Sequence, residues 1–438
     1  MAKNRKNSKT SSNHISRISD ASATTMKLDE PEAHPQDLHD YLVGYTYSNQ
    51  YKDGEWSLVR LPYGSKQMGA PITEDQGHSD PIECLLEGES RRILDHQPAF
   101  SSELPSAIPN SYYIAGSPGK ELGMFAARPL RTGDVIIVER PLIIRPYDLP
   151  LRPMDSSKKK TLYTQPRADE EEHVMTALFE RLSARNKAIY LDLHNSQYAE
   201  VFGQLTGIFM TNMVDLGGLF GPACPDVCRY AGVFKDISRI NHSCSPNAVK
   251  HWDKRSFAFI VHVARDIAAD EEITLPYCAL YEPAAKRRNI LQAFYHFWCK
   301  CDACCNSAAS DARRAELLKN RYKLKNVTHW AADPTLPDDY CLEAYLRHAR
   351  LLEQENLQSD GIYWQILACI TTCYSALGDF EEMTKASEKM VPHYQAAYVN
   401  EGDLSSMRLA VEFKYLWRAR LRTSKEEAHR DWLDRLVT

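Results

Sequence analysis

The sequence predicts an α+β fold followed by an all-helical C-terminal region, and three observations support this prediction. Short β-branched runs follow one another between residues 112 and 144 with no helix among them, which is typical of small, mostly antiparallel sheets. Helical spacing over residues 170–211 separates these runs from a second strand-like stretch at residues 256–264. From residue 312 to residue 438 the apolar residues recur at helical spacing in almost every segment. We therefore expect one domain of small sheets with a helical insertion, and a helical domain after it.

The composition excludes several classes of function. The 438 residues suffice for two or three domains of roughly 150 residues each. The net charge is −5 and the sequence shows no basic face, so direct nucleic-acid binding is not expected. No window holds the roughly 20 apolar residues of a membrane span, and the polar N-terminus lacks the apolar core of a secretory signal. Twelve cysteines without an export signal indicate a reducing compartment, so we expect the nucleus or the cytoplasm, with thiols that bind metal or pack as small apolar groups.

The N-terminal quarter of the chain is the least informative. Residues 1–36 are rich in Ser, Asn and Lys without periodicity, so they are expected to form a disordered tail. Residues 37–109 form a poorly defined extension with more aromatic side chains than a linker needs, and we expect short structured pieces that pack onto a neighbour. Clear order begins at Tyr112. Strands are expected at residues 112–115, 123–127, 135–138 and 141–144.

The mixed domain is expected to span residues 110–285, with its helical insertion at about residues 165–225. In the insertion Val174, Leu178 and Leu182 share one helix face, and two shorter helices are expected to follow.

A cysteine-rich segment, residues 286–310, follows the mixed domain and begins within a predicted helix at residues 284–297. Residues 311–438 are expected to form the helical domain. Its paired helices resemble tetratricopeptide-like hairpins, although no clean repeat of roughly 34 residues is present.

Three separated motifs carry the chemistry. The stretch Arg239-Ile240-Asn241-His242-Ser243-Cys244-Ser245-Pro246-Asn247 offers polar groups that could hold a small charged ligand. Residues 270–277 place Tyr277 beside an expected strand end. Cys299, Cys301 and Cys304 have C-x-C-x-x-C spacing, which is typical of metal ligands, and Cys244 is available as a fourth thiol. Taken singly, an Asn-His pair is more often a loop with a satisfied histidine, and three thiols are moderate evidence for a metal.

Together these motifs resemble the C-terminal half of a SET domain, the fold of protein lysine methyltransferases. The segment Gly119-Lys120-Glu121-Leu122-Gly123 resembles the first cofactor loop of that family. The order of a split SET domain, post-SET cysteines and a helical tail is similar to the SET and MYND domain family. No cysteine lies between Cys84 and Cys224 to build the MYND zinc finger, so the chain looks more like the SET proteins of fungi that lack it.

The resemblance implies a cofactor, S-adenosylmethionine, and a role for each motif residue. Tyr277 would be catalytic, with its hydroxyl directed at the transferring methyl group. Cofactor contacts would come from Lys120, Leu122, Gly123, Asn212, Asn241, His242, Tyr277 and Phe297. For Asn212, a helix C-cap is an equally good interpretation. One structural zinc ion would be held by Cys244, Cys299, Cys301 and Cys304.

Two positions depart from the family pattern. Glu121 stands where the family usually has glycine, and a glutamate at positive φ would strain the loop. Asp270 replaces a glycine before the Glu-Glu pair, a change that tight turns tolerate. Tyr281 and Phe257 are candidates for an aromatic channel around the lysine stem, but each alone is more often a core residue.

Two hypotheses from different classes follow. The leading one is a zinc-containing, S-adenosylmethionine-dependent protein lysine methyltransferase whose substrate is a histone or a non-histone protein. The rival is a catalytically weak SET scaffold whose helical tail binds protein partners, and Glu121 is the residue that favours it. A transferase that binds free nucleic acid is disfavoured by the acidic net charge.

Overall fold

The computed structural model describes residues 56–61, 81–96, 104–147, 149, 165–198, 201–217, 219, 229–321, 324, 326–333 and 335–397. The predicted tail at residues 1–36 lies outside these ranges, as do parts of the extension at 37–109 and the end of the helical domain after residue 397. Among the described residues, no helix is both long and apolar enough to cross a membrane.

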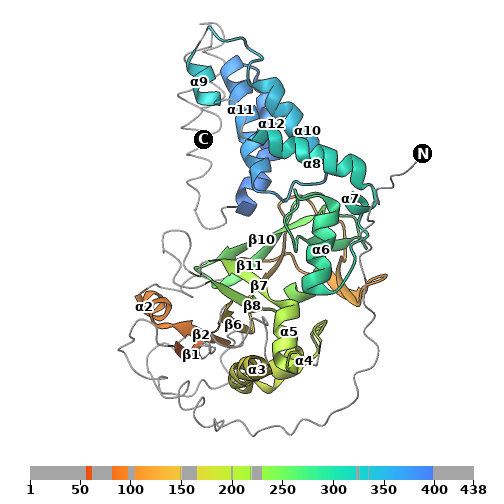
Figure 1. Ribbon diagram of the computed structural model, residues 1–438. Helices are drawn as coiled ribbons and strands as arrows, with labels where there is room; N and C mark the ends of the chain where they lie inside the picture. The colour runs from red at the N-terminus through yellow and green to blue at the C-terminus, as the bar shows by residue number, and fades with distance from the viewer. Residues whose placement is uncertain are drawn as a thin grey trace, which may run out of the picture.

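Three small sheets form the β part of the protein (Figure 1). Their strand orders are β1-β2-β6-β8-β7, β10-β11-β5 and β3-β4-β12-β9. The strands are β1 Trp56–Leu61, β2 Ile82–Glu87, β3 Tyr112–Gly116, β4 Leu122–Ala126, β5 Val135–Glu139, β6 Ile143–Pro146, β7 Val214–Gly217, β8 Tyr230–Val233, β9 Asn241–His242, β10 Ala248–Asp253, β11 Ala258–Val263 and β12 Glu272–Leu275. Most pairings are antiparallel, the described exceptions being β2 with β6 and β12 with β9. The expected small sheets are therefore confirmed.

The helices fall into three groups along the chain. They are α2 Gly88–His96; α3 Gln165–Glu180, α4 Ala184–Leu191 and α5 Gln204–Asn212; then α6 Ala284–Tyr295, α7 Asp302–Cys305, α8 Ser307–Arg321, α9 Val327–Ala332, α10 Leu342–Gln354, α11 Ile362–Leu377 and α12 Phe380–Ala397. A short 3-10 turn, η1, spans Ile237–Arg239.

The N-terminal extension contributes structure to the largest sheet. Strand β2 pairs with β1 on one side and runs parallel to β6 on the other, with Glu83 opposite Ile143. Every residue of β2 is buried, because both faces of this strand are covered. Ile82, Cys84 and Leu86 face one apolar cluster, whereas Leu85 belongs to a second cluster on the opposite face. The expected short structured pieces in this region therefore pack into the sheet itself.

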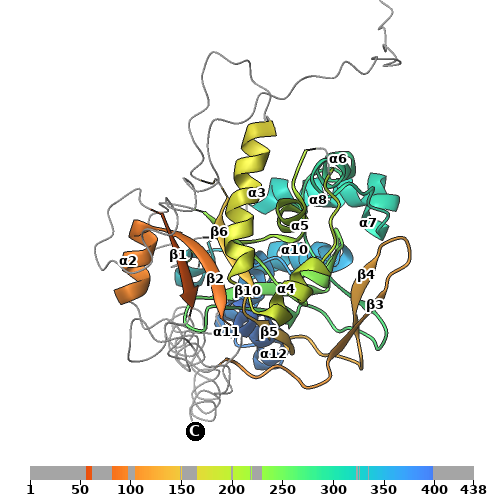
Figure 2. The ribbon, with the colours of Figure 1, turned by 90° about the horizontal axis from the view of Figure 1, so that it is seen from below.

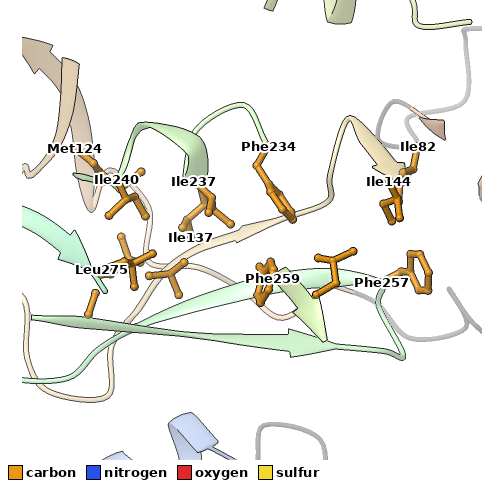
Figure 3. Close-up of a cluster of buried hydrophobic side chains, with 14 of the residues drawn as sticks. Ile82, Met124, Ile137, Ile144, Phe234, Ile237, Ile240, Phe257, Phe259 and Leu275 are labelled. Atoms are coloured by element: carbon orange, nitrogen blue, oxygen red, sulfur yellow. The ribbon is translucent and has the colours of Figure 1, made fainter. Parts of the chain in front are cut away.

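The helical insertion covers one face of this sheet. Val174, Leu178 and Leu182 are all buried and pack with apolar residues of the sheet, as their spacing predicts. In Figure 2, α3 crosses the sheet and α4 and α5 lie next to it. The opposite face packs against the two smaller sheets, where Phe234, Ile240, Phe259 and Leu275 meet in one core (Figure 3).

The C-terminal helices α8 to α12 pack together above the sheets in Figure 1. Their shared core includes Trp330, Tyr345, Ile366 and Met390. This bears out the expected helical region after the cysteine-rich segment. The helical region approaches the sheets where α12 lies against the turn before β5. A Cβ added to Gly133 in that turn would lie 2.7 Å from Cβ of Pro392 in α12. Because Gly133 has a φ of +91°, both its conformation and this close approach require glycine.

Candidate active site and metal centre

Strand β12 fixes the Asn-His pair in place. Asn241 and His242 form the two-residue strand β9, which lies parallel to β12 with Thr274 opposite Asn241. On its other side β12 pairs with β4, so three motif segments become neighbouring strands. The buried Asn247 side chain closes the arrangement: its Oδ1 accepts the Thr274 N–H at 2.8 Å, and its Nδ2 donates to the Glu272 carbonyl at 2.9 Å.

A half-buried carboxylate, that of Glu139, holds the turn that precedes this pair. Glu139 accepts hydrogen bonds from the main-chain N–H groups of Lys235, Asp236 and Ile237, the first and last at 2.7 and 2.8 Å. These N–H groups open η1 and would otherwise be without helical partners. Burial raises the pKa of Glu139 to about 7, and the backbone hydrogen bonds oppose that shift.

Lys120, Gly123 and Asn241 converge on one carboxylate, that of Glu272. Nζ of Lys120 lies 2.7 Å from Oε2, while Nδ2 of Asn241 and Oγ of Ser117 lie 2.8 and 2.9 Å from Oε1. Asn241 Nδ2 also donates to the Leu122 carbonyl at 2.9 Å.

The backbone at Gly123 completes this convergence. A Cβ at Gly123 would meet Glu272 Oε1 at 2.6 Å and Asn241 Nδ2 at 2.9 Å. The structure thus brings together Lys120, Leu122, Gly123 and Asn241, and it adds Glu272 to them.

The loop before β4 does not have the strain that the sequence led us to expect. Positive φ falls on Gly119, at +72°, and not on Glu121. Glu121 instead reaches His194, whose Nδ1 lies 2.6 Å from its carboxylate, and both side chains are largely exposed. Asp270 does take positive φ, at +64°, which fits the predicted tight turn. The glutamate is therefore compatible with this loop, because the glycine two residues earlier absorbs the unusual backbone angle.

Tyr277 and His242 are joined through main-chain and side-chain hydrogen bonds. The Tyr277 N–H donates to His242 Nδ1 at 2.9 Å, and the Tyr277 hydroxyl donates to the Ile240 carbonyl at 2.5 Å. Burial raises the pKa of Tyr277, so its hydroxyl stays protonated at neutral pH. The Tyr277 ring lies 4.8 Å from that of Tyr295, and Phe297 lies 6.2 Å from His242, which makes a small aromatic cluster.

Four cysteines gather where the sequence predicts a metal site. The sulfur atoms of Cys244, Cys299, Cys301 and Cys304 all lie within 4.8 Å of one another. Cys244 Sγ is 3.6 Å from Cys304 Sγ and 4.0 Å from Cys299 Sγ. Zinc–sulfur bonds of about 2.3 Å in a tetrahedron place sulfurs roughly 3.8 Å apart, so the spacing fits a zinc site with four cysteine ligands.

These thiols also shift one another's pKa values. Hydrogen bonding with Cys278 and Cys299 raises the pKa of Cys244, whereas hydrogen bonding from Cys244 lowers the pKa of Cys301. Four thiols this close cannot all ionise without a cation among them, because each thiolate opposes the next. A divalent metal removes that conflict and would bind the cluster as thiolates.

Three residues that the sequence suggested for the site, Asn212, Phe257 and Tyr281, lie elsewhere in the structure. Asn212 lies at the end of α5, where its Nδ2 donates to the carbonyls of His194 and Ile208 at 2.6 and 2.8 Å. These two hydrogen bonds fit the alternative interpretation of Asn212 as a residue that caps the end of a helix. Phe257 is 1% exposed and packs edge-on against Trp252, and Tyr281 packs against the helical region, so neither lines an aromatic channel here.

Sequence reasoning missed three residues of this site. Glu272 is part of a recognised motif, but only the structure shows that it contacts Lys120 and Asn241 of the other two motif segments, together with Ser117. Tyr295 lies at the end of α6, two residues before Phe297. Because this helix separates Tyr295 from Tyr277 along the chain, the sequence does not show that their rings are close. Cys278 stands outside every motif, yet its sulfur lies within 4.8 Å of ligand atoms of both His242 and Cys244.

Comparisons with known proteins agree with this geometry. Residues 121–278 match the SET domain family. The chain therefore contains a region that matches the SET domain, and it is similar to the set5 and SMYD lysine methyltransferases. The matched range contains Gly123, the Asn-His pair, Glu272 and Tyr277. Lys120 and Ser117 lie just before it, and the three clustered cysteines after α6 lie beyond it.

Among its relatives is the histone-lysine N-methyltransferase set5 of Schizosaccharomyces pombe, 28% identical over 211 residues, or 47% of this chain and 56% of that protein. The N-lysine methyltransferase SMYD2-B of Danio rerio is 23% identical over 225 residues, or 47% of this chain and 49% of that protein. The chain therefore spans about half the length of these relatives. A solved structure, a putative histone methyltransferase of Plasmodium falciparum, aligns at 15% identity over 39% of this chain and 96% of that one with a TM-score of 0.19, a similarity too low to support an inference.

Proposed function

We propose that this protein transfers a methyl group from S-adenosylmethionine to the side-chain amine of a lysine in another protein. The observation that supports it most directly is the position of Tyr277. Its main-chain N–H is held by His242 and its hydroxyl by the Ile240 carbonyl, within a region that matches the SET domain. A tyrosine fixed at both ends can direct its hydroxyl at a reacting centre without a further conformational change.

The polar cluster around Glu272 fits the amino-acid end of such a cofactor. Lys120 offers a cation for a carboxylate, Glu272 an anion for an ammonium group, and Asn241 both a donor and an acceptor. His242, Tyr295 and Phe297 would flank the apolar and aromatic parts. Asn212 would act indirectly, by holding the His194 carbonyl near the Glu121 loop.

The cofactor when bound supplies an activated methyl group on a sulfonium sulfur. The residues of the chain have to align the lysine Nζ with that carbon, exclude water and favour the uncharged amine, since free lysine has a pKa near 10.4. The half-buried Tyr277, Tyr295 and Phe297 rings would provide the apolar surroundings that lower the amine pKa. The lysine Nζ would gain the methyl carbon as the carbon–sulfur bond breaks, and the amine would lose one proton to solvent.

Methyl transfer can be tested with Tyr277→Phe. Calorimetry should show that the purified protein binds S-adenosylmethionine, and labelled methyl groups should appear on lysines of histones or of proteins in a lysate. Tyr277→Phe should lose transfer by about a hundredfold or more while it keeps cofactor binding. Tyr113→Phe is the matched control, because its hydroxyl donates to the exposed Asp270 away from this cluster. Binding without transfer, unchanged by Tyr277→Phe, would instead support a scaffold.

We further propose that the cysteine cluster holds one structural zinc ion that ties the segment after α6 to Cys244. Elemental analysis should find one zinc per chain, and Cys244→Ser should lower zinc content and cofactor affinity together. Cys305→Ser is the control, because its exposed thiol points to the Lys300 carbonyl. Freshly purified protein without zinc would contradict this proposal.

The substrate and partner proposals rest on relatives and on the helical region. Set5 is described as a histone-lysine methyltransferase, so histones are the first substrates to assay, with action in the nucleus or the cytoplasm. We propose that α8 to α12, as tetratricopeptide-like hairpins, bind protein partners. A pocket of about 400 Å³ between α8 and α10, lined in part by Asn320 and Arg347, supports this. Cross-links from bound proteins should map to these two helices, and cross-links confined to the sheets would contradict it.

A further inference from the structure

Arg287 on α6 is fully buried against the cysteine cluster. It is 0% exposed, although arginine is rarely buried unless it is paired. Its Nε lies 3.3 Å from Cys244 Sγ and its Nη2 lies 3.7 Å from Cys304 Sγ. Both contacts join a guanidinium N–H donor to a sulfur atom, and guanidinium has no acceptor of its own. The two sulfurs it reaches are therefore acceptors in these contacts.

Asp311 forms a long, partly exposed ion pair with this guanidinium. Asp311 Oδ1 is 3.4 Å from Nη1 of Arg287, and the Asp311 side chain is 29% exposed. Both oxygens of Asp311 also accept the Ala284 N–H, each at 3.0 Å, at the start of α6. The remaining Arg287 contacts are main-chain carbonyls, those of Glu282 and Ala303.

An arginine stays charged at any pH that a protein tolerates, so its burial needs nearby negative charge. Four thiolates around one divalent zinc carry a net charge of −2, and neutral thiols carry none. The guanidinium is thus matched to the metal-loaded form of the cluster, where it offsets about half of that charge and donates to two of the four sulfurs.

We propose that Arg287 is a positioning residue for the metal: its charge and its two N–H donors stabilise zinc-bound Cys244 and Cys304 and slow the loss of the ion. This inference rests on the proposed zinc site. Arg287 belongs to α6 and lies outside the C-x-C-x-x-C segment. It would not contact the metal ion and would act on it through the cysteine ligands.

The neighbouring arginine provides a matched control. Arg288 is half-buried on the same helix turn, but its Nε donates to the Cys299 carbonyl at 2.9 Å and its guanidinium lies 5.2 Å from the Trp298 ring centre. It contacts the same segment without donating to a sulfur. A comparison of Arg287→Gln with Arg288→Gln therefore separates contact with sulfur from a general loss of positive charge near the cluster.

The experiment measures zinc release from the full chain into a chromogenic chelator. Arg287→Gln should release zinc about ten times faster than the wild type, whereas Arg288→Gln should stay within about twofold. Arg287→Lys keeps the charge but not the two-pronged contact, so its rate should be intermediate. In the cobalt-substituted protein, the sulfur-to-cobalt charge-transfer band should move to lower energy in Arg287→Gln, because the sulfur lone pairs lose their hydrogen-bond donors.

Each outcome decides a separate point. A wild type without zinc would remove the zinc proposal itself. A wild type with zinc, together with an unchanged release rate and an unchanged cobalt band in Arg287→Gln, would show that Arg287 only packs. If Arg287→Gln does not fold, Arg287→Lys decides: faster release with a shifted band supports the proposal, and wild-type values overturn it.

Discussion

The main-chain N–H of Tyr277 donates a hydrogen bond to Nδ1 of His242 at 2.9 Å. Because Nδ1 is the acceptor, the proton of the neutral ring must sit on Nε2. Nε2 lies 3.2 Å from Cys244 Sγ, so the ring donates to the first thiol of the cysteine cluster. One imidazole, 5% exposed, thereby connects the backbone of Tyr277 to the cysteine cluster.

We predict that His242→Phe destabilises the fold by about 1–3 kcal/mol, since the Tyr277 N–H loses its acceptor in a largely buried place. The same change should speed zinc release. Denaturant titration of the zinc-loaded protein measures the first effect. His296→Phe is the control, because its ring packs edge-on against the exposed Tyr198. Equal stability of His242→Phe and wild type would show that the hydrogen bond to Tyr277 contributes little.

We predict that Gly123→Ala weakens S-adenosylmethionine binding by about tenfold or more. The added Cβ would lie 2.6 Å from Glu272 Oε1 and 2.9 Å from Asn241 Nδ2, so both side chains have to move from the positions that bring Lys120 to Glu272. Calorimetry gives the affinity. Gly116→Ala is the matched control, because its nearest atom would be 3.9 Å away. The same loss of affinity in both variants would contradict the proposed role of the Glu272 cluster.

We predict that Arg314→Gln costs about 3–5 kcal/mol, the usual result of leaving a buried ion partner alone. Arg314 is 0% exposed; its Nε lies 2.8 Å from Glu355 Oε2 and its Nη2 donates to the Cys244 carbonyl at 2.9 Å. Arg313 also pairs with Glu355, but it is 35% exposed, so Arg313→Gln should cost no more than about 1 kcal/mol. Equilibrium unfolding in urea compares the two variants. Similar losses would mean that the contact with the Cys244 carbonyl adds nothing.

Acid should selectively weaken the helical region through His393. Burial lowers the pKa of His393 to about 4, below the 6.5 of a free histidine. Its contribution to stability is therefore complete above pH 6.5 and is lost as the pH falls through that value toward about 4.

The test is His393→Gln, which removes this titration. Its unfolding midpoint should fall less than that of the wild type between about pH 7 and about pH 4.5. His329→Gln, on the exposed side of α9, should follow the wild type. Parallel pH profiles for wild type and His393→Gln would show that His393 does not carry the effect.

The sequence predicted β3 to β6 and β11 at about their observed places, because short β-branched runs between turns have few alternatives. It did not predict β7, β8 or β10. Residues 112–115 and 123–127 correspond to β3 and β4, and the buried face of α3 follows from Val174, Leu178 and Leu182. The grouping of Cys299, Cys301 and Cys304 was foreseeable from their spacing, and that of Cys244 with them from the SET-domain resemblance. The order of strands in the sheets was not, since nothing local indicates that β2 pairs with β6.

Residues that act through long-range contacts were the ones missed. Glu272 lies 152 residues after Lys120 and 149 residues after Gly123, yet it joins both with Asn241 in space. Arg287 and Arg314 look like ordinary surface positions on amphipathic helices, and only tertiary packing shows that both are fully buried. For Glu121, a rule about glycine at positive φ was applied to the wrong residue of the loop, because the turn geometry places that angle on Gly119.

The parallel pairing of β2 with β6 has a consequence for how the chain can be shortened. Without residues 82–87, β6 would present its unpaired N–H and C=O groups along an apolar rim of the largest sheet. An exposed edge strand of this kind can pair with strands of other molecules. A fragment that begins at the first strand of the matched family region should therefore self-associate on expression, while one that retains the segment from residue 56 should stay dispersed.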